Sequence, residues 1–277
     1  MFLLTSTEAK KILSGLRRVS LDFGLTTSEV RVEKGLVVFP DGTSIPVGEV
    51  KAVLKKPNQV FLVTKEGLRP VYVAGRHFYK LVPTEGAPTV EVDGVRMHRT
   101  KDTTPDRDAL EKVRLLRIRG GLVLDVGTGL GYTAIQEVRM GADQVVTVEV
   151  SPEVLHIARV NPWSRPLFES ERIHVVLGDA YRLVEAFPDE AFDYVVHDPP
   201  RFSMAGELYS LDFYRALYRV LKPGGRLFHY VGKPGHRFRG IDLRRGVRER
   251  LLRAGFRSLR YHEPVMGFTC VKPSRRP

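Results

Sequence analysis

The segment LVLDVGTGLGYTA, residues 122–134, constrains the fold of this chain more than any other stretch. It opens with an apolar run without a polar break, which is typical of a strand buried on both faces. Asp125 ends this run, and three glycines follow at alternate positions, Gly127, Gly129 and Gly131. Glycine permits a turn and has no Cβ to obstruct a ligand, so strand, glycine turn and helix together bring the backbone close to a nucleotide. The motif alone also fits an ordinary turn.

Four further segments extend this interpretation. VVTVEV, residues 145–150, predicts the next strand and carries Glu149, whose carboxylate can accept both ribose hydroxyls of an adenosine. VVLGDA places Asp179 at a third strand end. FDYVVHDPPRF predicts a fourth strand that runs into Asp198-Pro199-Pro200, and LKPGGRLFHYV predicts a turn at Pro223-Gly224-Gly225 followed by a fifth strand. The alternation of strands and helices predicts an α/β fold.

As a set, these five segments resemble a class I S-adenosylmethionine (SAM) dependent methyltransferase over about residues 95–271. The resemblance implies a Rossmann-like sheet of seven strands in the order 3-2-1-4-5-7-6, with S-adenosyl-L-methionine as cofactor. The block HDPPRFSMAGELYS also resembles an archaeal group of predicted methyltransferases. NAD is a rival cofactor, because its fold shares the glycine turn and the acidic second strand end. The DPP block and the KPGG turn favour SAM.

The resemblance also assigns roles to single residues. It implies that Asp125 holds the amino-acid end of the cofactor, that Glu149 binds the ribose, and that Asp179 and Ala180 border the adenine. For Asp125 or Asp179 alone, a helix cap is the alternative. The predicted cofactor residues are Asp125, Gly127, Thr128, Gly129, Gly131, Glu149, Asp179, Ala180 and Asp198.

The loop of residues 198–202, DPPRF, is the predicted catalytic segment, with Asp198, Pro199, Pro200 and Phe202 as its catalytic residues. It follows the fourth strand, where ligands collect in open α/β sheets, and its two prolines stiffen it. In methyltransferases that act on nitrogens, the similar (D/N)PP(Y/F) loop accepts a hydrogen bond from the base, and its aromatic residue stacks on that base. Here Arg201 takes the aromatic position, so an exocyclic amine and a ring nitrogen such as guanine N7 both stay open as targets. A core position is the alternative for Phe202.

Two residues outside this loop bear on the chemistry. Tyr209 in GELYS is a candidate substrate contact, with a helix start as the alternative. Cys270 is the single cysteine, which excludes an internal disulfide and a cysteine-rich metal site, and we predict no metal. Cys270 lies in the predicted last strand, as a buried apolar residue, so a cysteine nucleophile for C5-pyrimidine methylation is not expected.

The chain is strongly basic, with a formal net charge of +12 over 277 residues, which favours an acidic partner such as nucleic acid. On a helix predicted from about Ile241, Arg244, Arg245 and Arg248 share one face, with Val247 in the core stripe. Guanidinium forks suit phosphates, so we predict RNA binding by these substrate residues, together with Arg201. A solvated basic face is the alternative.

The predicted organisation has three parts. Residues 1–94 form a small β-rich α+β domain, which is a substrate-docking module, or else a scaffold or dimer surface. Residues 95–120 form a connector helix, and residues 121–277 form the methyltransferase domain. In the first part, Thr7 is predicted to cap a helix that continues to about Arg18. LVVF with TSIPV, and QVFLVT with RPVYVAG, predict two hairpins, and PTEGAP predicts a linker. Pro105 suits the first turn of the connector helix.

The opening apolar run of three residues is too short for a signal peptide, and no stretch approaches the roughly 20 apolar residues of a membrane span. We therefore predict a cytoplasmic protein, and the few amides and single cysteine suggest a thermophile.

The predicted function is SAM-dependent methylation of a base nitrogen in tRNA or rRNA. The alternatives are methylation of a small molecule, aminopropyl transfer to a polyamine, and a non-catalytic nucleic-acid-binding protein. Aminopropyl transferases usually carry a GGGDG-type loop, where this chain has GTGLG.

Overall fold

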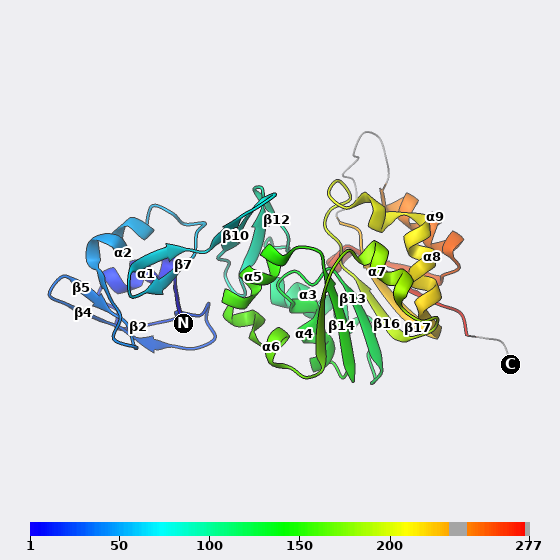
Figure 1. Ribbon diagram of the computed structural model, residues 1–277, viewed down its shortest axis with the longest axis horizontal. Coiled ribbons are helices and arrows are strands. Elements are labelled where there is room, and N and C mark those ends of the chain that lie inside the picture. The colour runs from blue at the N-terminus through cyan, green and yellow to red at the C-terminus, as the bar shows by residue number, and fades with distance from the viewer. Residues whose placement is uncertain (233–242, 275–277) are drawn as a thin grey trace. The chain divides into compact units, whose positions relative to one another are not determined.

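The computed structural model describes residues 1–232 and 243–274. The chain forms two compact units, and the ribbon diagram shows the elements of each (Figure 1). The first unit comprises Met1–Asp106 and Glu153–Arg165, and the second comprises Arg107–Pro152 and Pro166–Pro277. Within the described residues, every helix is too short or too polar to traverse a lipid bilayer.

The first unit is built from short antiparallel strands that form four small sheets. The sheets have the orders β1-β7-β8, β2-β3, β4-β5-β6 and β12-β11-β10-β9. The strands are β1 (Phe2–Leu4), β2 (Arg18–Val19), β3 (Ser28–Glu29), β4 (Arg31–Glu33), β5 (Leu36–Val38), β6 (Ser44–Pro46), β7 (Phe61–Thr64), β8 (Gly67–Pro70), β9 (Tyr72–Ala74), β10 (Phe78–Val82), β11 (Thr89–Val92) and β12 (Val95–Arg96). The helical elements are α1 (Ser6–Leu13), α2 (Val47–Val53), α5 (Pro152–Val160) and η1 (Pro162–Ser164).

The first helix differs from its prediction at both ends. Thr5, not Thr7, is the N-cap, because its side chain accepts a hydrogen bond from the Glu8 N–H at 3.4 Å. The helix ends at Leu13 rather than near Arg18, since Gly15 adopts φ 92°, a left-handed conformation that terminates helices.

The predicted hairpins are confirmed, and the predicted linker is wrong. β5 pairs with β6, and β7 pairs with β8, both antiparallel. Residues 83–88 join β10 to β11, which are neighbouring antiparallel strands of one sheet. The proline and glycine residues of PTEGAP therefore shape a hairpin loop inside the first unit.

The second unit contains a sheet of seven strands in the order β15-β14-β13-β16-β17-β19-β18, which reads 3-2-1-4-5-7-6 along the chain. The first five strands are parallel, and β19 runs antiparallel between β17 and β18. The strands are β13 (Leu122–Val126), β14 (Gln144–Glu149), β15 (Ile173–Leu177), β16 (Phe192–His197), β17 (Leu221–Tyr230), β18 (Arg257–His262) and β19 (Gly267–Val271). The helical elements are α3 (Pro105–Arg114), α4 (Tyr132–Arg139), α6 (Arg165–Glu169), α7 (Ala180–Ala186), η2 (Gly206–Tyr209), α8 (Leu211–Val220), α9 (Leu243–Ala254) and η3 (Glu263–Val265).

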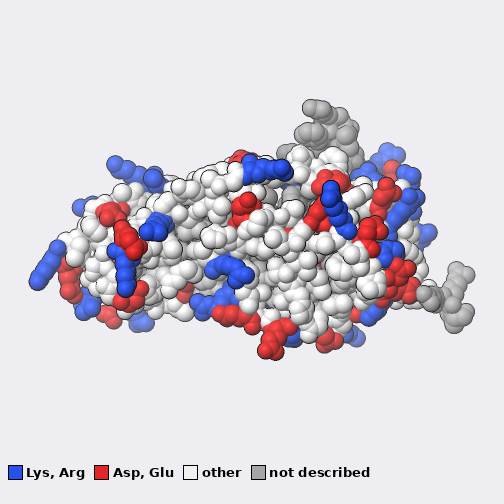
Figure 2. Space-filling view, viewed as in Figure 1, with Lys and Arg blue, Asp and Glu red and all other residues white. Residues whose placement is uncertain are grey.

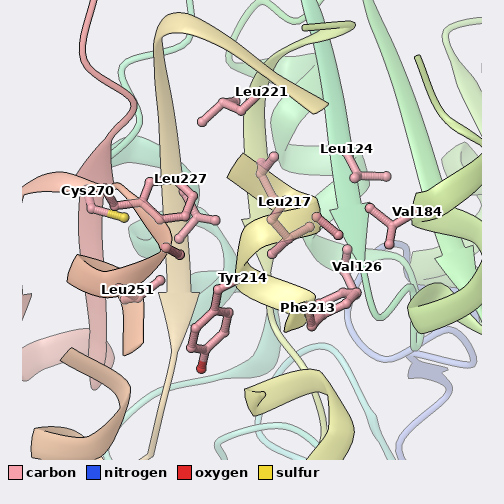
Figure 3. Packing of buried hydrophobic residues seen from close by; sticks show 14 of the residues in the cluster. Leu124, Val126, Val184, Phe213, Tyr214, Leu217, Leu221, Leu227, Leu251 and Cys270 are labelled. Atoms are coloured by element: carbon pink, nitrogen blue, oxygen red, sulfur yellow. The ribbon is translucent and has the colours of Figure 1, made fainter. Parts of the chain in front are cut away.

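Helices α7, α8 and α9 pack their apolar sides into the main core of this sheet (Figure 1). Figure 3 shows this packing, with Leu217 of α8 and Leu251 of α9 near strand residues such as Leu227. Cys270 is buried in β19, as predicted, and burial raises the pKa of its thiol. Val247 is buried as predicted, and α9 begins at Leu243; the predicted start at Ile241 lies outside the described residues.

The turn predicted at residues 223–225 does not form a separate element before the fifth strand. Residues 223–225 lie inside β17, where the pairing with β16 shifts register. Gly224 has φ 80°, a left-handed conformation that permits this irregular pairing within a continuous strand. Because β13, β14 and β16 are parallel, their carboxyl ends meet at one edge of the sheet, and this edge carries Asp125, Glu149 and Asp198.

Candidate active site

The glycine loop and the DPP loop contact each other directly. Gly127 has φ 96°, and a Cβ on it would lie 2.8 Å from the backbone oxygen of Asp198, so a larger residue there would push the two loops apart. Gly131 is the N-cap of α4 with φ 81°, and a Cβ on it would lie 2.6 Å from a methyl group of Leu167. Helix α4 starts at Tyr132, as predicted. The glycines therefore serve close packing as well as the turn.

Glu149 binds the glycine loop from the end of β14. Its carboxylate accepts hydrogen bonds from the Gly129 N–H at 2.9 Å and from the Ser151 N–H at 3.0 Å. Burial raises the pKa of Glu149, while these backbone bonds lower it. Each carboxylate oxygen has further acceptor capacity, so the predicted contact with ribose hydroxyls is compatible with this geometry.

Asp125 is fully buried at the end of β13 and keeps one oxygen without a partner. Its Oδ2 accepts a hydrogen bond from the Thr147 hydroxyl at 2.6 Å, and that hydroxyl lies 2.6 Å from the hydroxyl of Thr128. Oδ1 has no hydrogen-bond partner among the described residues. Burial raises the pKa of Asp125 to about 7. An orphaned buried carboxylate oxygen beside the glycine loop fits the ammonium group of SAM.

A second buried carboxyl lies in α4, the helix that follows the glycine loop. Glu137 is fully buried, and neither of its carboxyl oxygens has a hydrogen-bond partner among the described residues. Burial, and then the charge of Asp125, raise the pKa of Glu137 well above its usual value. Burial therefore favours the neutral form of Glu137.

Asp198 is held by an ion pair that we did not predict from the sequence. The ammonium group of Lys112 lies 2.7 Å from Asp198 Oδ2 and 2.8 Å from Asp108 Oδ2, and 4.6 Å from the centre of the Tyr230 ring. Burial raises the pKa of Asp198, and Lys112 opposes this rise. Burial also lowers the pKa of Lys112, but the two carboxylates outweigh this effect and raise it above its usual value. Lys112 thus favours the charged form of Asp198 against the effect of burial.

A signal for this pair was present in the sequence of α3, which begins at Pro105, as predicted. Lys112 follows Asp108 by four residues and lies next to Ala109, Val113 and Leu116 on the helix face that becomes buried. Charged residues at positions that an apolar periodicity assigns to the core are informative, because burial of a charge requires a partner.

The DPP loop is supported by core aromatic residues. The structure buries Tyr209, and its hydroxyl donates a hydrogen bond to the Pro200 carbonyl at 2.9 Å. Phe202 is half-buried and packs edge-on against the Tyr209 ring, with ring centres 5.4 Å apart. Arg201 is exposed. Tyr209 therefore fixes the loop from the core side, which differs from the predicted substrate contact.

Two stacked histidines lie beneath this loop. His197 and His229 face each other across β16 and β17, with ring centres 4.3 Å apart. His197 Nε2 lies 2.9 Å from the Leu208 carbonyl, to which it donates, and the Tyr214 hydroxyl lies 2.7 Å from His229 Nε2. Burial lowers the pKa of His197 to about 4, so this ring is neutral at physiological pH. The network joins the strand end to the segment that carries Tyr209.

At the end of β15, Asp179 acts as a helix cap. Its Oδ1 accepts a hydrogen bond from the Tyr181 N–H at 2.9 Å, at the start of α7, whose first residue is Ala180. Asp179 Oδ2 lies 3.6 Å from Arg182. Both predicted adenine residues thus lie at the same edge of the sheet as Glu149, since β14 and β15 are parallel neighbours.

The predicted basic face of α9 is partly neutralised. Arg244 lies 3.3 Å from Glu263 and stacks over the Tyr261 ring at 3.8 Å, and Arg245 lies 2.9 Å from Glu249. In Figure 2, Lys and Arg side chains at the α8 and α9 end of the second unit alternate with Asp and Glu. Arg248 is exposed. These contacts support the interpretation of this face as solvated surface.

Comparisons with known proteins agree with this architecture. A model of a methyltransferase domain matches residues 123–225. An uncharacterized protein of Methanocaldococcus jannaschii, MJ1233, is 43% identical over 98% of this chain and 95% of its own length. A polyamine aminopropyltransferase of Mycobacterium tuberculosis is 37% identical over 122 residues, which cover 40% of this chain and 23% of that protein. A crystal structure of spermidine synthase with the transition state analogue AdoDATO has a TM-score of 0.60, with 20% identity, over 74% of this chain and 73% of that chain.

The domain match and the fold place the second unit among the SAM-dependent methyltransferase folds, for which SAM is the cofactor. The orphaned oxygen of Asp125 and the tight packing at Gly127 suit that cofactor. The similarity to MJ1233 extends over almost the whole of both chains. The chain therefore belongs to the family of the uncharacterized protein MJ1233 and carries a class I SAM-dependent methyltransferase fold.

Proposed function

We propose that this protein transfers a methyl group from SAM to a nitrogen of a base in structured RNA, such as tRNA or rRNA. The observation that carries the proposal is the placement of Asp198. Its backbone oxygen lies against Gly127 of the glycine loop, and its carboxylate is held by Lys112 at 2.7 Å. A fixed carboxylate thus lies beside the segment that would hold the cofactor.

The described residues divide into cofactor-holding and acceptor-holding groups. Asp125 would bind the ammonium group of the cofactor and Glu149 its ribose, while SAM supplies a methyl group on a positively charged sulfonium. Methyl transfer from a sulfonium is a direct displacement, so the protein mainly has to align donor and acceptor. Asp198, whose ionised form Lys112 favours, would accept a hydrogen bond from the acceptor and stabilise the positive charge that develops on it. Tyr209 keeps the loop in place through the Pro200 carbonyl.

Two features support RNA as the acceptor. The net charge of +12 favours a polyanionic partner. Exposed Arg201 and half-buried Phe202 lie directly after the two prolines of the loop, where a guanidinium and an aromatic ring suit a phosphate and a flipped base. The first unit would then act as a docking module for the same RNA.

Aminopropyl transfer to a polyamine is the second candidate. It is supported by the similarity to polyamine aminopropyltransferases over 40% of this chain. The acidity of the site also supports it, since Asp108, Asp125, Glu149 and Asp198 lie in this part of the structure, where buried Lys112 pairs with Asp108 and Asp198. Such an environment suits a cationic amine. The GTGLG loop departs from the usual aminopropyltransferase sequence, which favours methyl transfer.

A label-transfer experiment separates the candidates. The purified protein is incubated with methyl-labelled SAM and total RNA from a host that lacks the gene, or with aminopropyl-labelled decarboxylated SAM and putrescine or spermidine. We expect label in RNA and none in polyamine, and we expect Asp198→Ala to abolish most of it. Label in polyamine alone would establish aminopropyl transfer in place of RNA methylation. Binding of SAM and RNA without label in any acceptor would establish a non-catalytic protein.

A further inference from the structure

A groove of about 460 Å³ lies in the second unit, away from the glycine loop. It is bounded by the C-terminal end of α3 and by strands β17, β18 and β19. Its ionisable lining residues come from α3, the segment after α3, β17 and β18: they are Glu111, Arg114, Arg117, Arg226, Arg260 and His262. Four arginines thus share one groove with one carboxylate.

The positive charge of this groove is largely uncompensated. Glu111 pairs with Arg114 at 2.7 Å, which uses the single acidic residue of the lining. Arg117 and Arg260 are exposed, and neither has an ion-pair partner among residues 1–232 and 243–274. Burial and the neighbouring Arg260 lower the pKa of His262, so this ring adds a neutral hydrogen-bonding group. The groove therefore differs from the basic face of α9, where Arg244 and Arg245 contact glutamates.

Arg226 is the most informative of the four. It is half-buried in β17, and it donates one hydrogen bond from Nη1 to the Leu116 carbonyl at 2.9 Å. No carboxylate pairs with it in the described part of the chain. A partly desolvated guanidinium without a carboxylate is costly unless an anion binds it. Its bond to Leu116 also caps a carbonyl near the end of α3 that would otherwise repel such an anion.

The backbone around the groove carries local strain. Arg117 has φ 51° and Ser258 has φ 55°, both in the left-handed region that non-glycine residues rarely adopt. Ser258 also lies where the pairing of β18 with β19 shifts register, between Arg257 and Arg260. Strained residues that border one charged groove favour a binding role for it.

We propose that this groove binds a backbone phosphate of the acceptor RNA, an inference that rests on the proposed function. Planar guanidinium forks bind phosphate oxygens in pairs, and four of them line this groove. Arg114 follows Lys112, the residue that holds Asp198, by two positions in α3. A phosphate in the groove would therefore be held by the same helix that positions the carboxylate of the active site.

The test is the double variant Arg117→Gln/Arg260→Gln, with Arg248→Gln/Arg253→Gln as a control that removes the same charge from exposed positions of α9. Affinity for tRNA is measured over a range of KCl concentrations. The groove variant should weaken tRNA binding about ten- to hundredfold at moderate salt and lower the slope of log affinity against log salt by about 1, because the contact with one phosphate is lost. The control should change both quantities much less. SAM affinity and thermal stability should match the wild type in each variant. The single variant Arg260→Glu, which reverses one charge of the groove, provides a second test of tRNA binding.

Three results would decide against parts of this scheme. If the groove variant binds tRNA with wild-type affinity and wild-type salt slope, the groove does not bind an RNA phosphate, even if RNA is methylated. Tighter binding of ATP or inorganic phosphate than of tRNA, lost in the groove variant, would assign the groove to a free phosphate ligand and overturn the RNA proposal. Groove-dependent tRNA binding without label transfer to RNA would support the groove and remove the proposed methylation.

Discussion

Replacement of Lys112 by Met should expose how much the active site depends on one buried cation. Methionine keeps much of the length of the side chain and removes its charge. The Lys112, Asp108 and Asp198 side chains are 7%, 4% and 19% exposed, with contacts of 2.8 and 2.7 Å. Loss of one partner from a buried ion pair costs about 3–5 kcal/mol, because it leaves an uncompensated charge. This is a large share of the roughly 5–15 kcal/mol by which domains are stable.

The size of this loss should depend on pH. Burial already raises the pKa of Asp198, and removal of Lys112 takes away the main opposing interaction, so the folded-state pKa rises further above the unfolded value. A carboxyl with a raised folded pKa destabilises the fold as pH increases through the window between those two pKa values. The loss of unfolding free energy in Lys112→Met should therefore be smaller near pH 5 than near pH 8.

Urea unfolding followed by circular dichroism at both pH values measures this effect. Lys222→Met is the matched control, since Lys222 lies 2.8 Å from Asp193 but the two side chains are 44% and 30% exposed. Such an exposed pair contributes about 1 kcal/mol or less. Equal losses in the two variants, or a Lys112→Met loss that is the same at pH 5 and pH 8, would refute the argument.

Four further substitutions test the site. Glu149→Ala should weaken SAM binding about ten- to hundredfold in calorimetry, because charged hydrogen bonds are lost, and unchanged affinity would remove Glu149 from the cofactor site. Gly127→Ala should lower both thermal stability and SAM affinity, since φ 96° and the contact with Asp198 leave no room for a Cβ, and a variant like the wild type would contradict this packing. Asp198→Ala should slow single-turnover methylation about 10²–10³-fold with SAM binding kept within a fewfold, and Asp198→Asn should be nearly as slow if the charge matters. Tyr209→Phe should cost about 0.5–1.5 kcal/mol of stability and slow turnover at saturating SAM, and an unchanged rate would show that the bond to Pro200 is dispensable.

Local patterns predicted much of the second unit. The apolar run before Asp125, the glycine turn and the helix start at Tyr132 are encoded by adjacent residues, and the structure has β13 and α4 at these positions. The same holds for the strand that ends at Glu149 and for Cys270 in the last strand. The roles of these residues toward cofactor and substrate stay predictions.

The features that could not be predicted from the sequence depend mainly on contacts between distant parts of the chain. The stack of His197 on His229 requires the register of β16 against β17, which no local pattern specifies. The groove arginines come from α3, the segment after it, β17 and β18, so composition alone could not group them. The error at Thr7 has a different origin, because several Thr and Ser residues near the start can cap a helix and only backbone geometry selects Thr5.

The ion pair of Lys112 with Asp198 also has a consequence for the folding pathway. It joins positions that are 86 residues apart, and it requires β16 to be docked beside β13. Contacts of such long sequence separation form after local helices and turns, since loop closure costs entropy before the contact repays it. Lys112→Met should therefore accelerate unfolding and leave the refolding rate nearly unchanged. The Asp198 carboxylate, which we propose to be catalytic, would then acquire its final environment among the last steps of folding.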